Sequence, residues 1–306
     1  MSIAPTSPLE SSALEALKAV VDPLTGVDWV SGRQLQALSV QDGLAQVRIK
    51  LGYPAASRWS AYTQLVTQAL MAVPGIRAVE TQWETQVQTH AVSRGQAPLP
   101  GARNLIAVAS GKGGVGKSTT AINLALALAG EGARVGLLDA DIYGPSQPTM
   151  TGTSGKPETL DGKLMEPKQR HGLQINSIGF LVSDDQAMVW RGPMASQALE
   201  QLITQTRWQE LDYLIVDMPP GTGDIQLTLA QKVPLTGAVI VTTPQDIALI
   251  DAKKGIKMFE KVGVPILGIV ENMAVHVCSA CGHQEHIFGA DGGRKMAEQY
   301  GMDYLG

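Results

Sequence analysis

A glycine-rich octapeptide with two lysines carries the clearest chemistry in this sequence. Residues 111–118 read Gly-Lys-Gly-Gly-Val-Gly-Lys-Ser and match the phosphate-binding pattern G-x-x-x-x-G-K-S/T. Glycines let backbone N–H groups curl closely around a phosphate, and the helix that follows adds the positive end of its dipole. In this pattern Lys117 reaches the terminal phosphates and Ser118 ligates Mg²⁺. The predicted nucleotide-binding residues of the loop are Gly111, Lys112, Gly113, Gly114, Val115, Gly116, Lys117, Ser118 and Thr119.

The sequence around the loop fits a phosphate site. Leu105–Ala109 is a short apolar run, as expected for a buried parallel strand. Thr119–Ala129 is rich in alanine and leucine and predicts a helix, with Gly130 near its end. The order strand, loop, helix separates a nucleotide site from a glycine-rich turn that binds nothing.

Aspartates follow two other apolar runs of the chain. Asp141 lies just past one run and Asp217 ends another. Ligands of parallel α/β sheets bind at the carboxyl ends of the strands, where a strand-terminal aspartate can position Mg²⁺. We assign Mg²⁺ binding to Asp217 together with Ser118, and orientation of the attacking water to Asp141. Each aspartate alone could be a helix cap or a turn residue, but the loop favours the functional interpretation.

Cys278 and Cys281 are the only cysteines of the chain. Thiolates are the usual ligands of iron–sulfur clusters, and a [4Fe–4S] cluster typically takes four of them. One chain supplies two, so two chains related by a two-fold axis supply the whole set. The count favours an iron–sulfur cluster that bridges two subunits. We expect the [4Fe–4S] type, although the count itself does not separate it from [2Fe–2S].

Three other uses of the cysteine pair stay open at the level of sequence. His283 and His286 follow closely and would complete four zinc ligands in one chain, although zinc fingers separate their ligand pairs by about a dozen residues or more. Four cysteines from two chains could hold a bridging zinc. A redox C-x-x-C is the third use, although this pair does not follow the first strand of a thioredoxin-like unit.

The pattern of the chain changes near residue 90, which indicates two domains in 306 residues. Residues 1–90 read as helix, two strands, helix and strand, a small α+β domain whose aromatic residues are explained by packing. Residues 91–103 read as a linker. Residues 104–306 alternate strands and helices and predict a doubly wound, mostly parallel α/β sheet. The expected strands are 134–139, 211–217, 238–242 and 265–272, and the expected helices include 194–206 and 246–261.

The composition excludes several classes of protein. Hydrophobic residues make up 44% and charged residues 17%, which is ordinary for a globular protein. A net charge of −4 gives no global reason to expect nucleic acid or an anionic membrane as partner. No apolar run approaches the roughly 20 residues that span a bilayer. With no secretory signal and few cysteines, we expect a cytoplasmic protein.

The motifs together resemble one family. With Lys112 directly after its first glycine, the loop resembles the deviant Walker A motif of the ParA/MinD class of dimeric ATPases. Three segments and the cysteine pair look like one branch of this class, the Mrp/ApbC iron–sulfur cluster carriers: residues 139–146, 190–194 and 217–224. The N-terminal region is similar to a small domain often fused to this branch. Between the two cysteines, Ser279 stands where the branch commonly has proline.

The resemblance implies roles for particular residues. Lys112 would cross a two-fold interface to the nucleotide of the partner subunit and serve catalysis together with Lys117 and Asp141. Asn272 matches the asparagine that recognises adenine in this class, with a helix or turn cap as the alternative. Arg191 would sense the nucleotide or serve the interface, and a surface salt bridge is an equal alternative.

The function implied by the resemblance is that of an ATPase of low turnover. It would be a homodimer that binds ATP, Mg²⁺ and a bridging cluster, receives the cluster from donors and transfers it to apo iron–sulfur proteins. One alternative is a ParA/MinD-type positioning ATPase that acts on DNA or membrane. Another is a zinc-bridged ATP-dependent adaptor.

Two expectations concern the ends of the chain. The N-terminal domain contains no cysteine, so we interpret it as a docking or regulatory unit. The sequence stops at Tyr304–Gly306, where a strand begins, whereas members of the family usually continue through another strand and helix. We therefore expect a truncated C-terminus.

Overall fold

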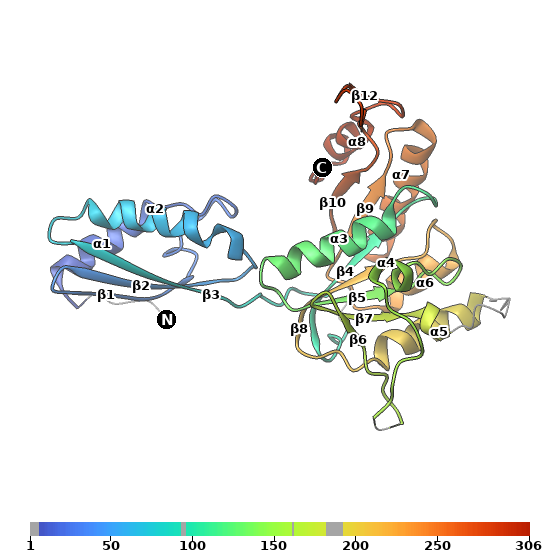
Figure 1. Cartoon of the computed structure of the whole chain (residues 1–306), viewed down its shortest axis with the longest axis horizontal. Coiled ribbons are helices and arrows are strands. Elements are labelled where there is room, and N and C mark those ends of the chain that lie inside the picture. Colours follow the sequence, from blue (N-terminus) through green and yellow to red (C-terminus); the bar gives the residue numbers. More distant parts are fainter. Residues whose placement is uncertain (1–5, 93–95, 161, 182–191) are drawn as a thin grey trace. The chain divides into compact units, whose positions relative to one another are not determined.

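The computed structural model describes residues 6–92, 96–160, 162–181 and 192–306. These residues form two compact units (Figure 1). The small unit runs to Gln88 and includes Gly130–Ala133, and the large unit holds Thr89–Ala129 and Arg134–Gly306.

The small unit is an α+β fold with helices on one face of a three-stranded sheet. The sheet has the order β1-β2-β3, with β1 and β2 antiparallel and β2 and β3 parallel. This is the predicted order of helix, two strands, helix and strand. Its elements are α1 (Pro8–Lys18), β1 (Leu35–Gln41), β2 (Leu44–Leu51), η1 (Ala56–Arg58), α2 (Trp59–Met71) and β3 (Ala78–Thr85).

Local sequence explains the small unit. The turn between β1 and β2 has φ values of 51° at Asp42 and 80° at Gly43, which suits a tight β-hairpin. Trp29, Tyr62 and Trp83 pack together in the core, with ring centroids 5.3 to 5.6 Å apart. The prediction that the aromatic residues belong to the core is therefore confirmed for this cluster.

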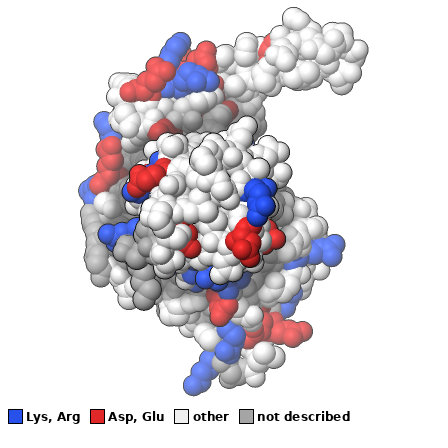
Figure 2. All heavy atoms as spheres, turned by 90° about the vertical axis from the view of Figure 1, so that its left-hand side faces the viewer, with Lys and Arg blue, Asp and Glu red and all other residues white. Residues whose placement is uncertain are grey.

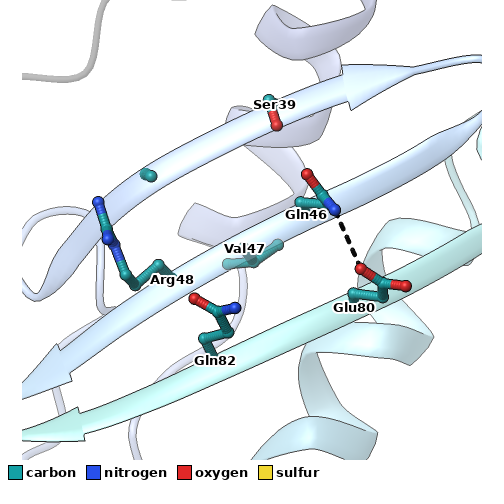
Figure 3. Close-up of a pocket in the computed structure, with 7 residues that line it drawn as sticks. Ser39, Gln46, Val47, Arg48, Glu80 and Gln82 are labelled. Carbon is teal, nitrogen blue, oxygen red and sulfur yellow. Dashed lines mark hydrogen bonds between the residues drawn. The ribbon is translucent and has the colours of Figure 1, made fainter.

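The other face of the small sheet is polar. A shallow hollow of ≈ 170 Å³ lies on it, lined by residues that include Ser39, Arg48 and Gln82 (Figure 3). Gln46 donates a hydrogen bond through Nε2 to Glu80 Oε2 at 3.0 Å across neighbouring strands. This face carries hydrogen-bonding side chains, whereas the apolar side chains of β2 point to the helices.

The large unit is built on a seven-stranded sheet of order β10-β9-β4-β8-β5-β7-β6. Its strand pairs are parallel except β6 with β7, which confirms the predicted doubly wound, mostly parallel sheet. The strands are β4 (Ala102–Ala109), β5 (Val135–Asp139), β6 (Lys168–Arg170), β7 (Leu173–Ser177), β8 (Leu211–Asp217), β9 (Gly237–Thr242) and β10 (Ile266–Glu271).

Helices follow most of these strands, and a small ribbon projects after β10. The ribbon pairs β11 (His276–Val277) with β12 (Gln284–Glu285) in antiparallel fashion. The helical segments are α3 (Lys117–Gly130), α4 (Gln147–Thr151), η3 (Ile178–Phe180), α5 (Gly192–Thr204), α6 (Asp224–Lys232), α7 (Asp246–Val262) and α8 (Gly292–Tyr300). The strand predicted at 105–109 begins three residues earlier, at Ala102, and the other expected strands and helices lie within two residues of the observed bounds. The strands β6 and β7 were not expected.

The burial of its strands explains why the large sheet could be predicted from the sequence. Every residue of β5 and of β9 is buried, as expected for parallel strands covered on both faces. The sheet places the carboxyl ends of β4, β5 and β8 side by side, because these strands are parallel neighbours. The loops that follow them therefore meet at one edge.

The surface agrees with the near balance of charges in the sequence. Figure 2 shows acidic and basic side chains interspersed over the face that it draws, without a large field of one sign among the described residues there. In the part of the chain that the structure describes, no helix has both the length and the apolar character of a membrane crossing.

Gly101, the residue directly before β4, should not tolerate replacement by a residue that has a side chain. Gly101 has a φ of +83°, and a Cβ there would lie 2.0 Å from the Trp208 carbonyl oxygen. We expect Gly101→Ala to lower the free energy of unfolding by at least about 2 kcal/mol, from backbone strain and overpacking together. Gly172→Ala is the control, since φ is +76° there with no atom within 4 Å. Equal losses in urea unfolding of the two variants would contradict this account.

Candidate functional site

The glycine loop lies between β4 and α3, as predicted. Gly114 and Gly116 have φ values of +80° and +87°, which glycine adopts without strain. Among the described residues, no atom lies within 4 Å of a Cβ built on Gly113 or Gly114, so this part of the loop faces away from the rest of the described structure. A Cβ on Gly111 would instead lie 2.2 Å from the carbonyl oxygen of Asp251 in α7. The loop therefore packs on α7 and leaves its central glycines free to approach a phosphate.

Lys117 is the centre of the site. It is buried, and its ammonium forms an ion pair with Asp217 Oδ1. Its Nζ also lies 3.8 Å from Asp141 Oδ2 and donates to Ser118 Oγ at 3.2 Å. The structure thus brings the two predicted Mg²⁺ ligands and the predicted water-orienting aspartate together around one lysine. Asp217 is 0% exposed, so its carboxylate requires this neutralising partner.

Gln147 completes the site, although no sequence pattern pointed to it. It is fully buried at the start of α4, and its Nε2 donates to Asp217 Oδ2 at 2.9 Å and to the Ser118 carbonyl oxygen at 3.0 Å. Its backbone N–H donates to Asp139 Oδ2 at 3.0 Å. One residue therefore ties α4 to the ends of β5 and β8 and to the start of α3.

Asp139 is a second residue of the site for which the sequence predicted no role. It stands opposite Asp217 in the ladder between β5 and β8 and is 0% exposed. Its Oδ2 accepts from Ser177 Oγ at 3.0 Å and its Oδ1 from the Asp141 N–H at 3.2 Å. Burial, followed by the nearby charge of Asp217, raises the pKa of Asp139 to about 7. The run Leu137–Asp139 was its only signal in the sequence.

Two orphaned polar atoms lie beside this network. Within the described residues, Gln147 Oε1 and Ser146 Oγ are buried and have no hydrogen-bond partner. Buried polar atoms normally have partners, so an unpartnered pair calls for an explanation. A water or ligand held next to Asp217 would supply the missing hydrogen bonds.

Asn272 lies against the glycine loop. Its Nδ2 donates to the Val115 carbonyl oxygen at 3.0 Å, and a Cβ on Gly116 would lie 2.1 Å from the same nitrogen. The fold therefore places the predicted adenine-recognising residue at the loop. Lys112 is half-buried in the loop, and its carbonyl oxygen accepts from Ser110 Oγ at 2.8 Å. Arg191, with Trp190 of the same predicted motif, lies outside the described residues.

Cys278 and Cys281 occupy the turn of the β11–β12 ribbon. Cys278 donates its N–H to the His283 carbonyl oxygen at 2.9 Å, and Gly282 donates back to the Cys278 carbonyl oxygen at 2.8 Å. Both thiols are free; Cys278 is half-buried and Cys281 is exposed. Hydrogen bonds from the backbone N–H groups of Ala280 and Cys281, and from the Cys281 side chain, lower the pKa of Cys278. N–H groups directed at sulfur favour the thiolate, which is the form that binds metals.

The described structure does not gather the possible zinc ligands of the ribbon around one point. Among the residues with described placement, no group of three or more histidine, cysteine, aspartate or glutamate side chains could hold a metal ion. His286 is hydrogen-bonded through Nδ1 to the Ala274 carbonyl oxygen. An intrachain zinc bound by Cys278, Cys281, His283 and His286 has no support from this arrangement.

Two family models match the chain. A model described as NUBPL iron-transfer P-loop NTPase matches residues 101–306, and one described as iron-sulfur cluster assembly protein matches residues 10–83. The second match lies within the small unit, and the first covers most of the large unit together with Gly130–Ala133 of the small one.

Proteins similar to this chain are named as iron–sulfur cluster carrier or transfer proteins. The chain is 61% identical over 251 residues to the iron-sulfur cluster carrier protein of Escherichia coli (strain K12), which covers 81% of this chain and 68% of that protein. It is 55% identical over 232 residues to the iron-sulfur cluster transfer protein NUBPL of Mus musculus, with 74% and 73% covered. A solved nucleotide-binding protein from Archaeoglobus fulgidus, in complex with ADP, is 40% identical with a TM-score of 0.59 over 66% of this chain and 80% of that chain.

Removing the amide of Gln147 should destabilise the large unit. Gln147→Leu leaves Asp217 Oδ2 and the Ser118 carbonyl oxygen without their donor, and hydrogen bonds to charged groups contribute about 1.5–3 kcal/mol. We expect a loss of about 2 kcal/mol in urea unfolding without nucleotide. Gln174→Leu is the matched control, because its amide bonds to Gln209 at 2.9 Å are exposed and neutral. A loss as large in the control would show that the buried carboxylate is not the reason.

The raised pKa of Asp139 predicts a pH dependence. Between about pH 4 and pH 7 the folded state keeps a proton on Asp139 that the unfolded state releases, so this group makes stability fall as pH rises. Subtracting the free energy of unfolding of Asp139→Asn from that of the wild type cancels the contributions of the other titrating groups. We expect this difference to fall by about 1.4 kcal/mol per pH unit in that window. Ser177→Ala keeps the carboxyl group and should keep the slope; a flat difference for Asp139→Asn would refute the assignment.

Proposed function

The chain belongs to the family of NUBPL iron-transfer P-loop NTPases, and on this basis we propose that it carries iron–sulfur clusters between the thiol ribbons of two subunits. The observation that carries this proposal is the ribbon itself. It presents two thiols, with N–H groups directed at Cys278 sulfur, and no third ligand among the described residues. A second copy of the chain would supply the remaining two thiolates.

The surface around the ribbon supports pairing of two copies. Four apolar side chains flank the cysteines in the sequence and are exposed: Val275 by 47%, Val277 by 52%, Ile287 by 63% and Phe288 by 42%. Exposed apolar surface that forms a patch marks an interaction site in many soluble proteins. A homodimer that faces ribbon to ribbon would cover these side chains and enclose the cluster, for which we propose the [4Fe–4S] type with four thiolate ligands.

The glycine loop would bind the phosphates of ATP through its backbone N–H groups. The central glycines face open space, and Ser118 and Asp217 already lie on either side of the Lys117 ammonium, which fits a nucleotide with Mg²⁺. When bound, Mg²⁺ would neutralise phosphate charge and be held by Ser118 and Asp217. Lys117 would then leave Asp217 for the phosphates. The orphaned Oε1 of Gln147 can accept a hydrogen bond from water in this space.

We assign orientation of the attacking water to Asp141. Its Oδ1 accepts hydrogen bonds from the N–H groups of Tyr143 and Gly144, both at 3.2 Å, which fixes the direction of its carboxylate. Its Oδ2 faces the Lys117 ammonium. We assign Lys112 to the nucleotide of the partner subunit and Asn272 to the adenine. Hydrolysis with these parts would be slow, because its role is to switch the dimer rather than to turn over ATP.

The small unit would serve docking. It holds no cysteine, and the polar face of its sheet offers side chains that can recognise a protein donor or an apoprotein (Figure 3). We place this activity in the cytoplasm, where free thiols such as Cys278 and Cys281 stay reduced. The family match favours cluster transfer over a positioning ATPase that acts on DNA or membrane.

Iron analysis of cysteine variants tests the proposal. After anaerobic reconstitution, the wild type should bind four iron and four sulfide per dimer, which is the content of one [4Fe–4S] cluster held by the four thiolates of two chains. Cys278→Ala should bind less than about a tenth of this iron, since the cluster loses two of its four thiolate ligands. Ser279→Ala, which changes the residue between the thiols, is the matched control and should load fully.

Two further measurements separate the alternatives. Lys117→Ala should lose ATP binding in calorimetry while it still loads the cluster, because the loop and the ribbon hold different ligands. A full complement of iron and sulfide in Cys278→Ala would overturn the proposal. Zinc that resists replacement by iron in the wild type would instead favour the zinc-bridged adaptor.

A further inference from the structure

The thiol ribbon leaves the large sheet and returns to it at one point. Residues 273–290 lie between β10 and α8. Glu271, the last residue of β10, accepts hydrogen bonds from the Asp291 N–H at 2.9 Å and from the Gly293 N–H. Its side chain is buried, and it joins the end of the ribbon segment back to its beginning. The ribbon is therefore held at its base, and a shift of this base moves both of its ends together.

The residue next to this base contacts the phosphate loop. Asn272 donates its backbone N–H to the Thr242 carbonyl oxygen at 2.8 Å, so its main chain is fixed to β9. Its side chain donates to the Val115 carbonyl oxygen at 3.0 Å. The contact with Gly116 is so close that a Cβ there would lie 2.1 Å from Asn272 Nδ2. A displacement of the loop at Val115 or Gly116 therefore cannot occur without a response from Asn272.

The chain from Asn272 to the first thiol is short and locally fixed. Met273 follows with a φ of +61°, an uncommon conformation for a side-chain-bearing residue. The Ala274 carbonyl oxygen is hydrogen-bonded to His286 on the returning side of the ribbon. The N–H of Cys278 is bonded to the His283 carbonyl oxygen at 2.9 Å. Each step between the loop and the thiols is thus a specific contact rather than a free linker.

We infer that Asn272 is a positioning residue that couples the phosphate loop to the thiol ribbon, so that nucleotide binding changes the exposure of Cys278 and Cys281. The inference rests on the proposed binding of ATP at the loop. Coupling of this kind is reciprocal: a ligand on the thiols would change the affinity for nucleotide by the same factor. The role differs from adenine recognition, which would use the same amide but would not involve the ribbon.

Thiol labelling tests the coupling without any cluster. Cys278 and Cys281 are the only cysteines, so alkylation of the reduced apoprotein by iodoacetamide reports on the ribbon alone. We expect saturating ATPγS with Mg²⁺ to change the alkylation rate of the wild type by about fivefold or more. In Asn272→Ala and in Asn272→Asp, which keeps the size but removes the donor, the change should fall below about twofold. Gln284→Ala alters the ribbon away from its base and should respond like the wild type.

The nucleotide specificity separates the two roles of Asn272. Because Asn272 is also assigned to the adenine, both variants should bind ATPγS more weakly and lose part of the preference for ATP over GTP, so alkylation is compared at concentrations that saturate each variant. The inference is overturned if the variants lose that preference while saturating ATPγS still changes alkylation as in the wild type. It also fails if the wild type loads iron and sulfide but its alkylation ignores ATPγS. If alkylation responds and no cluster forms, the cluster-carrier proposal fails while the coupling stands.

Discussion

A lysine ammonium and an aspartate carboxylate meet in the large unit at a position that water barely reaches. Lys117 is 6% and Asp217 0% exposed, so either charge alone would be costly there, by about 3–5 kcal/mol when its partner is removed. The rest of the site satisfies this constraint. Asp141, Ser118 and Gln147 share the two charges through ion-pair and hydrogen-bond contacts. A site organised in this way is prepared to exchange one cation for another, since its carboxylates are already oriented toward a positive charge.

The same arrangement explains how much could be predicted from the sequence. The order of strand, loop and helix was predicted correctly because glycine spacing and the apolar run 105–109 are local signals. Asp217 was selected as a candidate for the same reason, as it ends an apolar run. Asp139 was missed because its importance comes from strand order: β5 lies beside β8 only through a crossover that no local pattern encodes.

Gln147 and the edge pair β6–β7 show a second limit. A glutamine at the start of a five-residue helix has no distinctive pattern, and its function arises from three contacts with residues 8 to 70 positions away in the sequence. The strand β6 has three residues, two of them exposed, so it lacks the apolar run that marked the other strands. The fold of the large unit was therefore predictable where burial is complete, and its details were hidden where tertiary contacts decide.

The two candidate sites follow different strands of one sheet. The loop after β4 and the ribbon after β10 belong to different strands, yet Asn272 brings them into contact at the carboxyl edge. A carrier must hold its cargo in one state and release it in another, which requires a ligand that prefers one of those states. The phosphate loop can distinguish nucleotide states through Lys117, because this lysine cannot serve Asp217 and the phosphates equally. Because Asn272, next to the base of the ribbon, contacts the loop, a change in the ion pairing of Lys117 can reach the thiols without a large rearrangement of the sheet.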